Sequence, residues 1–378
     1  MRIGIDARMY GLEHAGVGRY VMKLVETVLK FDKKNEYVLF LRKNHVADFK
    51  NRKKVKVVET NVSIYSLPEQ LLLPIIFSRE KLDLLHLPHF NAPLFYPSKY
   101  ILTVHDLIKH DSKGQETTTR QPWLYFVKRL GYLFLTSLIT KRAAHIIVPS
   151  EYVKNDIVKR LKVKESKITV THEAVSGSLK EVELTPTEKR QVLAKFGLHQ
   201  PFVVYTGNVY PHKNVDLLIN AIAIHNQNRE VDLELALICS RSVFWERLNQ
   251  KIKEKKLGKW IKMLGYLEDK DVSEIYSLAL ALVHPSKMEG FGLTGLEAMS
   301  LGLPVVSSRA SCLPEVYGEA ALFFDPDIVE DLVEKLERII KDADLRNDLI
   351  SKGYHQARKY SWDKMGKETI AVYQQVLK

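Results

Sequence analysis

The sequence predicts an α/β protein of two domains, each built on a parallel sheet. Short apolar runs alternate with helix-length amphipathic segments along the chain, which is typical of parallel strands joined by helices. The alternation starts afresh at Phe202–Tyr205, which reads as a buried strand. With 378 residues, the chain is long enough for two or three domains that each bury a core.

Each apolar run marks the expected position of one strand, with helices expected between the runs. In the first half these runs are Arg2–Asp6, Tyr37–Leu41, Val55–Glu59, Leu84–Leu87, Tyr100–Val104, His145–Val148 and Lys167–Val170. In the second half they are Phe202–Tyr205, Leu235–Cys239, Ile261–Leu264, Leu280–Val283, Val305–Ser307 and Ala321–Phe323.

A linker is expected between the two halves. Residues 174–190 are small, polar and proline-bearing, so we place a hinge near Ser176–Glu183. The first domain is predicted over residues 1–180 and the second over 181–361. Ser361 has the side chain of an N-cap, and a last helix is expected over residues 362–378.

Composition narrows the class of protein. No run of about 18 apolar residues suggests a membrane span. The amino terminus reads as a strand rather than as a secretion signal. The two cysteines, Cys239 and Cys312, have no CxxC spacing and no histidine partner, so they are expected as small buried side chains in a reduced compartment. We expect a cytoplasmic protein.

The charge is concentrated in the first half. Residues 1–180 have a net charge of +14 and the remainder −2, which together give the +12 of the whole chain. Basic clusters lie at Lys50–Lys56 and Lys154–Lys167. Such a surface suits an anionic membrane, at which the protein would sit peripherally, or a phosphate-bearing acceptor; the alternative is plain solvation. Nucleic acid is not expected, because no zinc finger or aromatic RNA-binding strand is present.

Residues 280–302 carry the most informative pattern. An apolar run is followed by a glycine-broken loop and then by a helix-like segment that stops at Gly302. The free N–H groups of a helix start form an anion site. Glu289 and Glu297 flank this turn with seven residues between them, a layout that suits a nucleotide-diphosphate sugar. Alternatively, Thr294 and Glu297 form a capping box, and Glu289 is an exposed loop residue.

A second strand-to-helix turn lies at residues 201–214. Here Lys213 and Asn214 follow a glycine turn at a predicted helix start. A cation is slightly unfavourable at that end of a helix, which favours an anion such as a diphosphate nearby. The alternative is a solvated lysine.

The segment around Glu289 and Glu297 resembles the E-x7-E signature of retaining glycosyltransferases of family 4. These have the GT-B fold, in which two Rossmann-like domains face a central cleft and the C-terminal helix crosses back to the first domain. Residues 304–308, 311–316 and 324–326 are similar to that family as well. The resemblance implies a donor-binding second domain and an acceptor-binding first domain.

The resemblance also assigns expected roles on the donor side. Glu289 would contact the donor sugar, and Glu297 would hold the ribose hydroxyls. Lys213 matches the diphosphate-binding lysine, whereas Asn208 stands where many members have arginine. The remaining donor-binding residues would be Phe291, Gly292 and Leu293 in the loop and Gly16 and Gly18 in the first domain.

Three histidines of the first half are candidates for ligand contacts. His105 follows a buried strand, where ligands bind in doubly wound sheets, and the family resemblance implies contact with the donor sugar. A histidine satisfied by a neighbouring carbonyl is the alternative. His86 and His89 end the preceding strand and are candidate acceptor-side contacts.

Two further patterns are interpreted as structural. Residues 322–327 imitate a D-x-D metal site, but they end a strand and lead through Pro326 into a helix, so a turn and N-cap is the better interpretation. Residues 123–142 interleave aromatic and basic side chains, and a buried crossover helix is favoured over a membrane-surface helix.

The resemblance therefore implies a retaining glycosyltransferase that needs no metal and no cofactor beyond its nucleotide-diphosphate sugar. It would move a mannose-, glucose- or GlcNAc-like sugar to a glycan or lipid-linked acceptor in cell-surface polysaccharide or glycolipid synthesis. Catalysis would rest on Glu289, His105 and Lys213. Two alternatives remain open, namely a nucleotide-sugar 2-epimerase on the same fold and an inactive GT-B-like binding protein.

Overall fold

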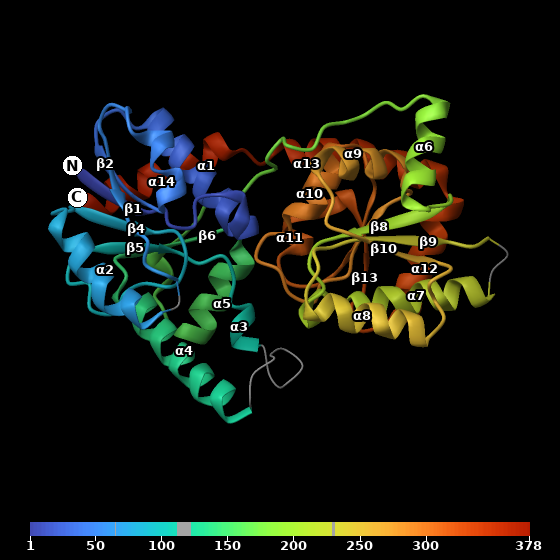
Figure 1. Cartoon of the computed structure of the whole chain (residues 1–378), viewed down its shortest axis with the longest axis horizontal. Coiled ribbons are helices and arrows are strands. Elements are labelled where there is room, and N and C mark those ends of the chain that lie inside the picture. Colours follow the sequence, from blue (N-terminus) through green and yellow to red (C-terminus); the bar gives the residue numbers. More distant parts are fainter. Residues whose placement is uncertain (65, 112–121, 229–230) are drawn as a thin grey trace. The chain divides into compact units, whose positions relative to one another are not determined.

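The computed structural model describes residues 1–64, 66–111, 122–228 and 231–378, and these form two compact units (Figure 1). The N-terminal unit comprises residues 1–173 and 361–378, and the C-terminal unit comprises residues 174–360. The division falls after Glu173, so residues 174–180, expected in the first domain, belong to the C-terminal unit.

The N-terminal unit has a seven-stranded, all-parallel sheet with the order β3-β2-β1-β4-β5-β6-β7. Its strands are β1 (Arg2–Asp6), β2 (Glu36–Leu41), β3 (Val55–Glu59), β4 (Leu84–Leu87), β5 (Tyr100–Thr103), β6 (His145–Val148) and β7 (Ile168–Val170). Its helices are α1 (Ala15–Phe31), α2 (Leu67–Arg79), α3 (Ile108–Asp111), α4 (Pro122–Arg142), α5 (Glu151–Leu161) and α14 (Trp362–Leu377). Ile5 of β1 pairs with Leu39 on one side and His86 on the other, so the strand order reverses between β1 and β4.

The C-terminal helix α14 packs on α1 in the N-terminal unit, as Figure 1 shows. Gly366 makes this packing possible, because a Cβ there would strike the side chain of Thr27. Lys30 and Asp363 form an ion pair of 2.7 Å across the two helices. Ser361 occupies the predicted N-cap position, although its side chain makes no capping hydrogen bond.

The C-terminal unit has a six-stranded parallel sheet with the order β10-β9-β8-β11-β12-β13. Its strands are β8 (Phe202–Thr206), β9 (Glu234–Ile238), β10 (Ile261–Gly265), β11 (Leu282–His284), β12 (Val305–Ser308) and β13 (Ala321–Phe324). Its helices are α6 (Pro186–Phe196), α7 (Val215–Asn228), α8 (Val243–Glu254), α9 (Asp269–Leu278), α10 (Leu293–Ser300), α11 (Leu313–Tyr317), α12 (Val329–Lys341) and α13 (Ala343–Arg358). In Figure 1, α7, α8 and α12 cover one face of the sheet, and α9, α10 and α13 cover the other.

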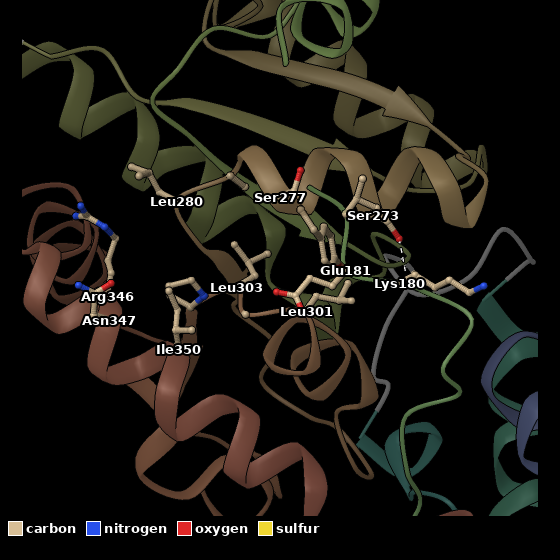
Figure 2. A pocket seen from close by; sticks show the side chains of 15 residues that line it. Lys180, Glu181, Ser273, Ser277, Leu280, Leu301, Leu303, Arg346, Asn347 and Ile350 are labelled. Atoms are coloured by element: carbon tan, nitrogen blue, oxygen red, sulfur yellow. Dashed lines mark hydrogen bonds between the residues drawn. The ribbon is translucent and has the colours of Figure 1, made fainter. Parts of the chain in front are cut away.

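The predicted linker is seated on the C-terminal unit. The N–H of Lys180 donates to Ser273 in α9, and Tyr354 in α13 donates to Glu181. A cavity of about 310 Å³ lies beneath this segment, bounded also by Leu303 and Arg346 (Figure 2). This cavity lies at the amino ends of β11 and β12, so it is distinct from the candidate functional site, which is described below and lies at their carboxyl ends.

Helix α4 only partly fits the prediction of a buried crossover helix. Thr136, Ile139 and Thr140 are buried, but Leu130 and Phe134 are exposed. Polar threonines are thus buried in α4 while two large apolar side chains remain exposed. No helix in the described part of the chain is long and apolar enough to cross a membrane.

Candidate functional site

The site of the C-terminal unit is built at the carboxyl ends of β8, β11 and β12. The sheet order reverses between β8 and β11, which is where ligands bind in doubly wound sheets. Two hydrogen bonds from backbone N–H groups hold the loops after these strands together. The N–H of Lys287 donates to the carbonyl of His212 at 2.8 Å, and the N–H of Glu289 donates to Oγ of Ser311 at 3.0 Å. The loops after three strands therefore form one connected wall.

Glu289 is the centre of a buried charge cluster, which contradicts the alternative of an exposed loop residue. Its Oε1 atom lies 2.6 Å from Nζ of Lys213 and 2.9 Å from Nε2 of His284. Burial alone would raise the pKa of this carboxyl, but Lys213 and His284 outweigh it and hold the pKa of Glu289 well below its usual range. Glu289 is therefore ionised at neutral pH.

The cluster leaves hydrogen-bonding capacity for a ligand. Within the described residues, Oε1 is the only oxygen of the Glu289 carboxylate that accepts hydrogen bonds, so Oε2 can still accept from a hydroxyl group. The ammonium of Lys213 has three N–H donors and uses one on Glu289. The pair can thus hold a sugar hydroxyl and a phosphate oxygen at once.

Lys213 ends a short 3-10 turn (Pro211–Lys213) rather than lying in the helix itself. Asn214 follows with a left-handed backbone, φ 56°, and α7 begins at Val215. The side chain of Asn214 donates to the carbonyl of Pro326 at 2.9 Å, which fixes this turn. The sharp turn points Lys213 toward Glu289 and leaves the start of α7 next to it.

Two glycines bring the loop against Tyr317. Gly292 has a φ of +88° and is the N-cap of α10, so the N-cap itself has no side chain to cap the helix. A Cβ on Gly292 would lie 2.7 Å from Leu313 and 2.8 Å from the hydroxyl of Tyr317, and a Cβ on Gly295 would clash with that hydroxyl as well. The hydroxyl of Tyr317 accepts from the N–H of Gly295, the third residue of α10. Within the described residues, no side chain caps the N–H groups of Leu293 and Thr294, as an anion site requires.

The capping-box interpretation of Glu297 does not hold. Helix α10 starts at Leu293 with Gly292 as its N-cap, so Thr294 lies inside the helix and cannot cap it. Glu297 is half-buried in the second turn of α10. Its contact with a ribose stays a prediction.

The other donor-side residues differ in accessibility. The ring of Phe291 is buried and packs edge-on against Tyr360 at 5.2 Å, so it supports the loop from inside. Leu293 is half-buried at the start of α10, and Asn208 is exposed. The carbonyl of Asn208 accepts a hydrogen bond from Tyr205, so its backbone is fixed while its amide group faces solvent.

His105 lies two residues beyond β5 in the N-terminal unit and is held on both nitrogens. Nδ1 is 2.9 Å from Glu173, and Nε2 is 3.1 Å from the carbonyl of Pro88. Burial would lower the pKa of this imidazole, but the hydrogen bond and charge of Glu173 raise it above its usual value. This matches the alternative of a histidine satisfied by a carbonyl, and sugar contact stays a prediction.

His86 and His89 occupy different environments. His86 is fully buried, with Nδ1 2.6 Å from Tyr373 and Nε2 2.8 Å from Thr103, and burial lowers its pKa to about 3. It is thus a core residue that anchors α14, which corrects its expected place on the acceptor side. His89 accepts from the N–H of Asn91 on Nδ1. Within the described residues its buried Nε2 has no hydrogen-bond partner, although Oδ2 of Asp6 lies 3.9 Å away. His89 therefore remains an acceptor-side candidate.

Gly16 and Gly18 both lie in the first turn of α1. Gly18 allows α1 to approach the backbone of Gly11, because a Cβ on Gly18 would clash with the Gly11 carbonyl. Gly16 is exposed, with no atom within 4 Å of a Cβ built on it. Packing therefore accounts for Gly18, while contact of either glycine with a ligand stays a prediction.

The structure also reveals residues that sequence reasoning missed. Arg8, just beyond β1, is fully buried and pairs with Asp6 and Glu69, each at 2.7 Å. Two opposite charges at the carboxyl end of a buried strand were a detectable signal. His284 and Tyr317 were also missed, because their spacing in the sequence gives no indication that they meet.

The D-x-D-like segment forms a turn, as predicted. Oδ1 of Asp325 accepts from the N–H of Asp327, and Asp327 pairs with Lys287. The N-cap of the following helix is Ile328, so neither aspartate caps it. No cluster of three or more metal-ligating side chains occurs in the described residues.

Two family models match the chain. Residues 15–176 match the model described as Glycosyltransferase Family 4, and residues 187–356 match the model described as Glycosyl transferases group 1. Together the matches cover most of both units.

Curated relatives include O-antigen mannosyltransferases. O-antigen chain mannosyltransferase B from Escherichia coli is 32% identical over 233 residues, which is 60% of either chain. O-antigen chain mannosyltransferase RfbU from Salmonella typhimurium is 26% identical over 305 residues, which covers 80% of this chain and 76% of that protein.

Solved structures share the fold along the whole chain. Sucrose-phosphate synthase from Thermosynechococcus elongatus superposes with a TM-score of 0.76 at 18% identity, covering 100% of this chain and 99% of that one. Anabaena HepE, solved in complex with UDP-glucose, has a TM-score of 0.72 at 16% identity and covers 99% and 100%.

Proposed function

The chain belongs to glycosyltransferase family 4 and has its GT-B fold, and we propose that it transfers a mannosyl group from a nucleotide-diphosphate donor to a glycan or lipid-linked acceptor. The Lys213–Glu289 pair beside the start of α10, with its N–H groups at Leu293 and Thr294, carries this proposal. The mannosyl group is proposed because both O-antigen relatives bear that activity in their names.

The site supplies what cleavage of a sugar–phosphate bond needs. Negative charge develops on the leaving diphosphate. The N–H groups of Leu293 and Thr294 in α10, those at the start of α7 and the remaining donors of Lys213 would stabilise it. Oε2 of Glu289 would accept from a sugar hydroxyl and orient the ring. We assign Glu297 to the ribose hydroxyls.

We propose that the reaction retains the anomeric configuration and needs no metal ion. Sequence reasoning finds no carboxylate for a double displacement on the acceptor side, which favours attack from the face that the diphosphate leaves. Lys213 and two helix starts are a charge source that would take the place of a divalent cation.

The alternatives can be separated in one assay. The protein is incubated with UDP-, GDP- and ADP-linked sugars, with no acceptor. Slow release of free sugar supports the transferase, formation of an epimer supports the 2-epimerase, and tight binding without chemistry supports the binding protein. A nucleotide that raises the melting temperature identifies the base of the donor.

The role of Lys213 is tested in the same assay. Lys213→Ala should lower turnover at least ~10²-fold by removing a cation from the developing diphosphate charge. EDTA should change turnover little. Strict dependence on Mg²⁺ or Mn²⁺ would contradict the assignment and would make Asp325 and Asp327 the candidate metal ligands.

We also propose that the N-terminal unit docks on an anionic membrane. Helix α2 exposes four aliphatic side chains, and Phe95 is exposed in the loop whose Leu94 N–H donates to Gln70 of α2. We call this set the apolar surface: Leu67, Leu71, Leu72, Ile75 and Phe95. The end of α2 reaches the basic cluster through the ion pair of Glu80 with Lys56. Apolar anchors beside lysines suit anionic lipid.

A further inference from the structure

His284 ends β11 with both ring nitrogens in buried contacts. Nδ1 lies 2.7 Å from the hydroxyl of Tyr317, and Nε2 lies 2.9 Å from Oε1 of Glu289. The residue is only 6% exposed, so the protein groups around it decide which atoms carry protons. A neutral imidazole has one N–H, whereas an imidazolium has two.

The Tyr317 contact requires a proton on Nδ1. The single hydroxyl proton of Tyr317 is used at the carbonyl of Gly292, 2.6 Å away, because a carbonyl can only accept. The N–H of Gly295 donates to the same hydroxyl oxygen at 3.2 Å. Nδ1 of His284 must therefore donate to Tyr317, because no other hydrogen is available for that contact.

The Glu289 contact requires a proton on Nε2. The carboxylate is ionised and can only accept, and Lys213 already donates to the same oxygen. A neutral His284 would leave one of its two contacts with lone pairs facing each other. Leaving a buried donor or acceptor without its hydrogen bond strongly destabilises the folded protein.

We propose that His284 is an imidazolium, and that its second proton positions Glu289 and the glycine loop (residues 289–292) for the donor. The Lys213–Glu289–His284 cluster then has a net charge of +1, whereas the Lys213–Glu289 pair alone is neutral. Because Asn208 is uncharged, this proton would give the phosphate site its surplus positive charge. The effect on turnover rests on the proposed function, but the charge state of the cluster does not.

The other titratable groups around the cluster stay neutral or are carboxylates. Burial raises the pKa of Tyr205, Tyr317 and Cys312, so each keeps its proton. Burial and then Lys213 lower the pKa of His212 to about 4, so it is uncharged at neutral pH. Two carboxylates lie farther out, Glu297 acting on Tyr317 and Glu315 on Cys312. Neither contributes a positive charge.

Proton positions can be observed directly in the ligand-free protein. Two-bond ¹H–¹⁵N spectra of the histidine side chains are recorded at pH 7, and the His284 signals are assigned by their loss in His284→Gln. Both nitrogens of His284 should be protonated. A single neutral tautomer would overturn the proposal. If His284→Gln does not fold, Tyr317→Phe provides the assignment by shifting the Nδ1 signal.

The positioning role is tested by the pH dependence of turnover. Wild-type turnover should fall on the alkaline side as His284 loses its proton. His284→Gln should lose about tenfold in turnover, the scale of one charge-assisted hydrogen bond, and should lack that alkaline fall. His199→Gln is the matched control, because His199 also pairs with a glutamate, Glu234 at 2.9 Å, but is 80% exposed.

Two results would contradict the positioning role. One is an alkaline fall that persists in His284→Gln, and the other is a wild-type profile that is flat where the spectra show His284 losing its proton. If the protein shows no transfer at all, the proposed function fails, while the spectra still decide the charge of His284.

Discussion

At the scale of single residues, both units stabilise ionised side chains by burying them with opposite charges. Glu289 is held between Lys213 and His284, and Arg8 between Asp6 and Glu69. Burying an unpaired charge is unfavourable, so removing one partner from either cluster should destabilise the folded protein. The clusters differ in access: Arg8 is fully enclosed, whereas Lys213 can still reach a ligand.

The two glutamates of the signature should have separable roles. Glu297→Ala should weaken nucleotide binding, because it is assigned to the ribose, which does not react. Glu289→Gln should chiefly lower turnover, because it is assigned to the sugar that reacts. Calorimetric titration with the nucleotide and steady-state kinetics measure the two effects. Wild-type nucleotide affinity in Glu297→Ala would remove its assigned role.

The His105–Glu173 pair should make stability depend on pH. Because Glu173 raises the pKa of His105, folding favours the protonated imidazole. The stabilisation is complete below the unfolded value of about 6.5 and is lost as pH rises through the raised pKa of the folded state. The melting temperature should therefore fall across that window. Glu173→Gln should flatten this part of the curve; an unchanged curve would contradict the assignment.

At the scale of elements, glycines decide how closely helices and loops approach each other. Gly292 and Gly295 admit the hydroxyl of Tyr317 under the loop, and Gly366 admits Thr27 between α14 and α1. In α1, Gly18 admits the carbonyl of Gly11. These contacts place the glycine loop and the C-terminal helix.

Gly16 and Gly18 provide a matched test of this packing on one helix. Gly18→Ala should destabilise the protein by ~1–3 kcal/mol, because the new methyl group clashes with the Gly11 carbonyl. Gly16→Ala should be neutral or stabilising by up to ~1 kcal/mol, because its Cβ meets open space and alanine favours helices. Urea unfolding compares the two. Equal effects would show that packing at Gly18 is not the cause.

At the scale of the whole molecule, the basic charge and the apolar surface belong to the same unit. The N-terminal unit, residues 1–173 and 361–378, carries a net charge of +14, and helix α2 in that unit exposes Leu67 at 82%. Of the lysines Lys53, Lys54 and Lys56, the last forms an ion pair with Glu80, so the cluster is partly neutralised, whereas Lys54 donates to the uncharged carbonyl of Lys33 and keeps its charge. Apolar contact should therefore add to electrostatic attraction.

Membrane docking has two separable parts. Binding to anionic vesicles should fall as salt rises, because added ions screen the lysines. Reversing Lys53, Lys54 and Lys56 to glutamate should weaken binding at low salt, with nucleotide affinity kept. Leu71→Ser with Ile75→Ser should weaken binding at every salt concentration, because burial of apolar area is not screened.

Vesicle co-sedimentation at two ionic strengths measures both effects. Tyr266→Ser is the matched control, since Tyr266 is 75% exposed but lies in the C-terminal unit. No binding at low salt would leave the charge of the first half as surface solvation. Equal weakening by Tyr266→Ser would remove the role of the apolar surface.

The sequence by itself determined the architecture of this protein. Runs such as Val203–Tyr205 are buried on both faces of a parallel sheet, and their short length and alternation with helix-length segments identify them as strands. All the predicted strands are present within about two residues of their expected bounds. Glu289 and Lys213 were also proposed as site residues, because each lies at a strand–glycine turn–helix junction that resembles a family motif. Their contacts with the donor stay predictions.

The tertiary structure alone decided how the site is held. Tyr317 lies 33 positions from His284, and Lys213 lies 76 positions from Glu289, and no local pattern specifies such contacts. The same holds for His86. The sequence suggests a ligand contact, but helix α14 packs over this histidine, and Tyr373 of α14 lies 2.6 Å from its Nδ1. Periodicity reports which face of an element is buried, whereas the partner on that face depends on how distant segments pack.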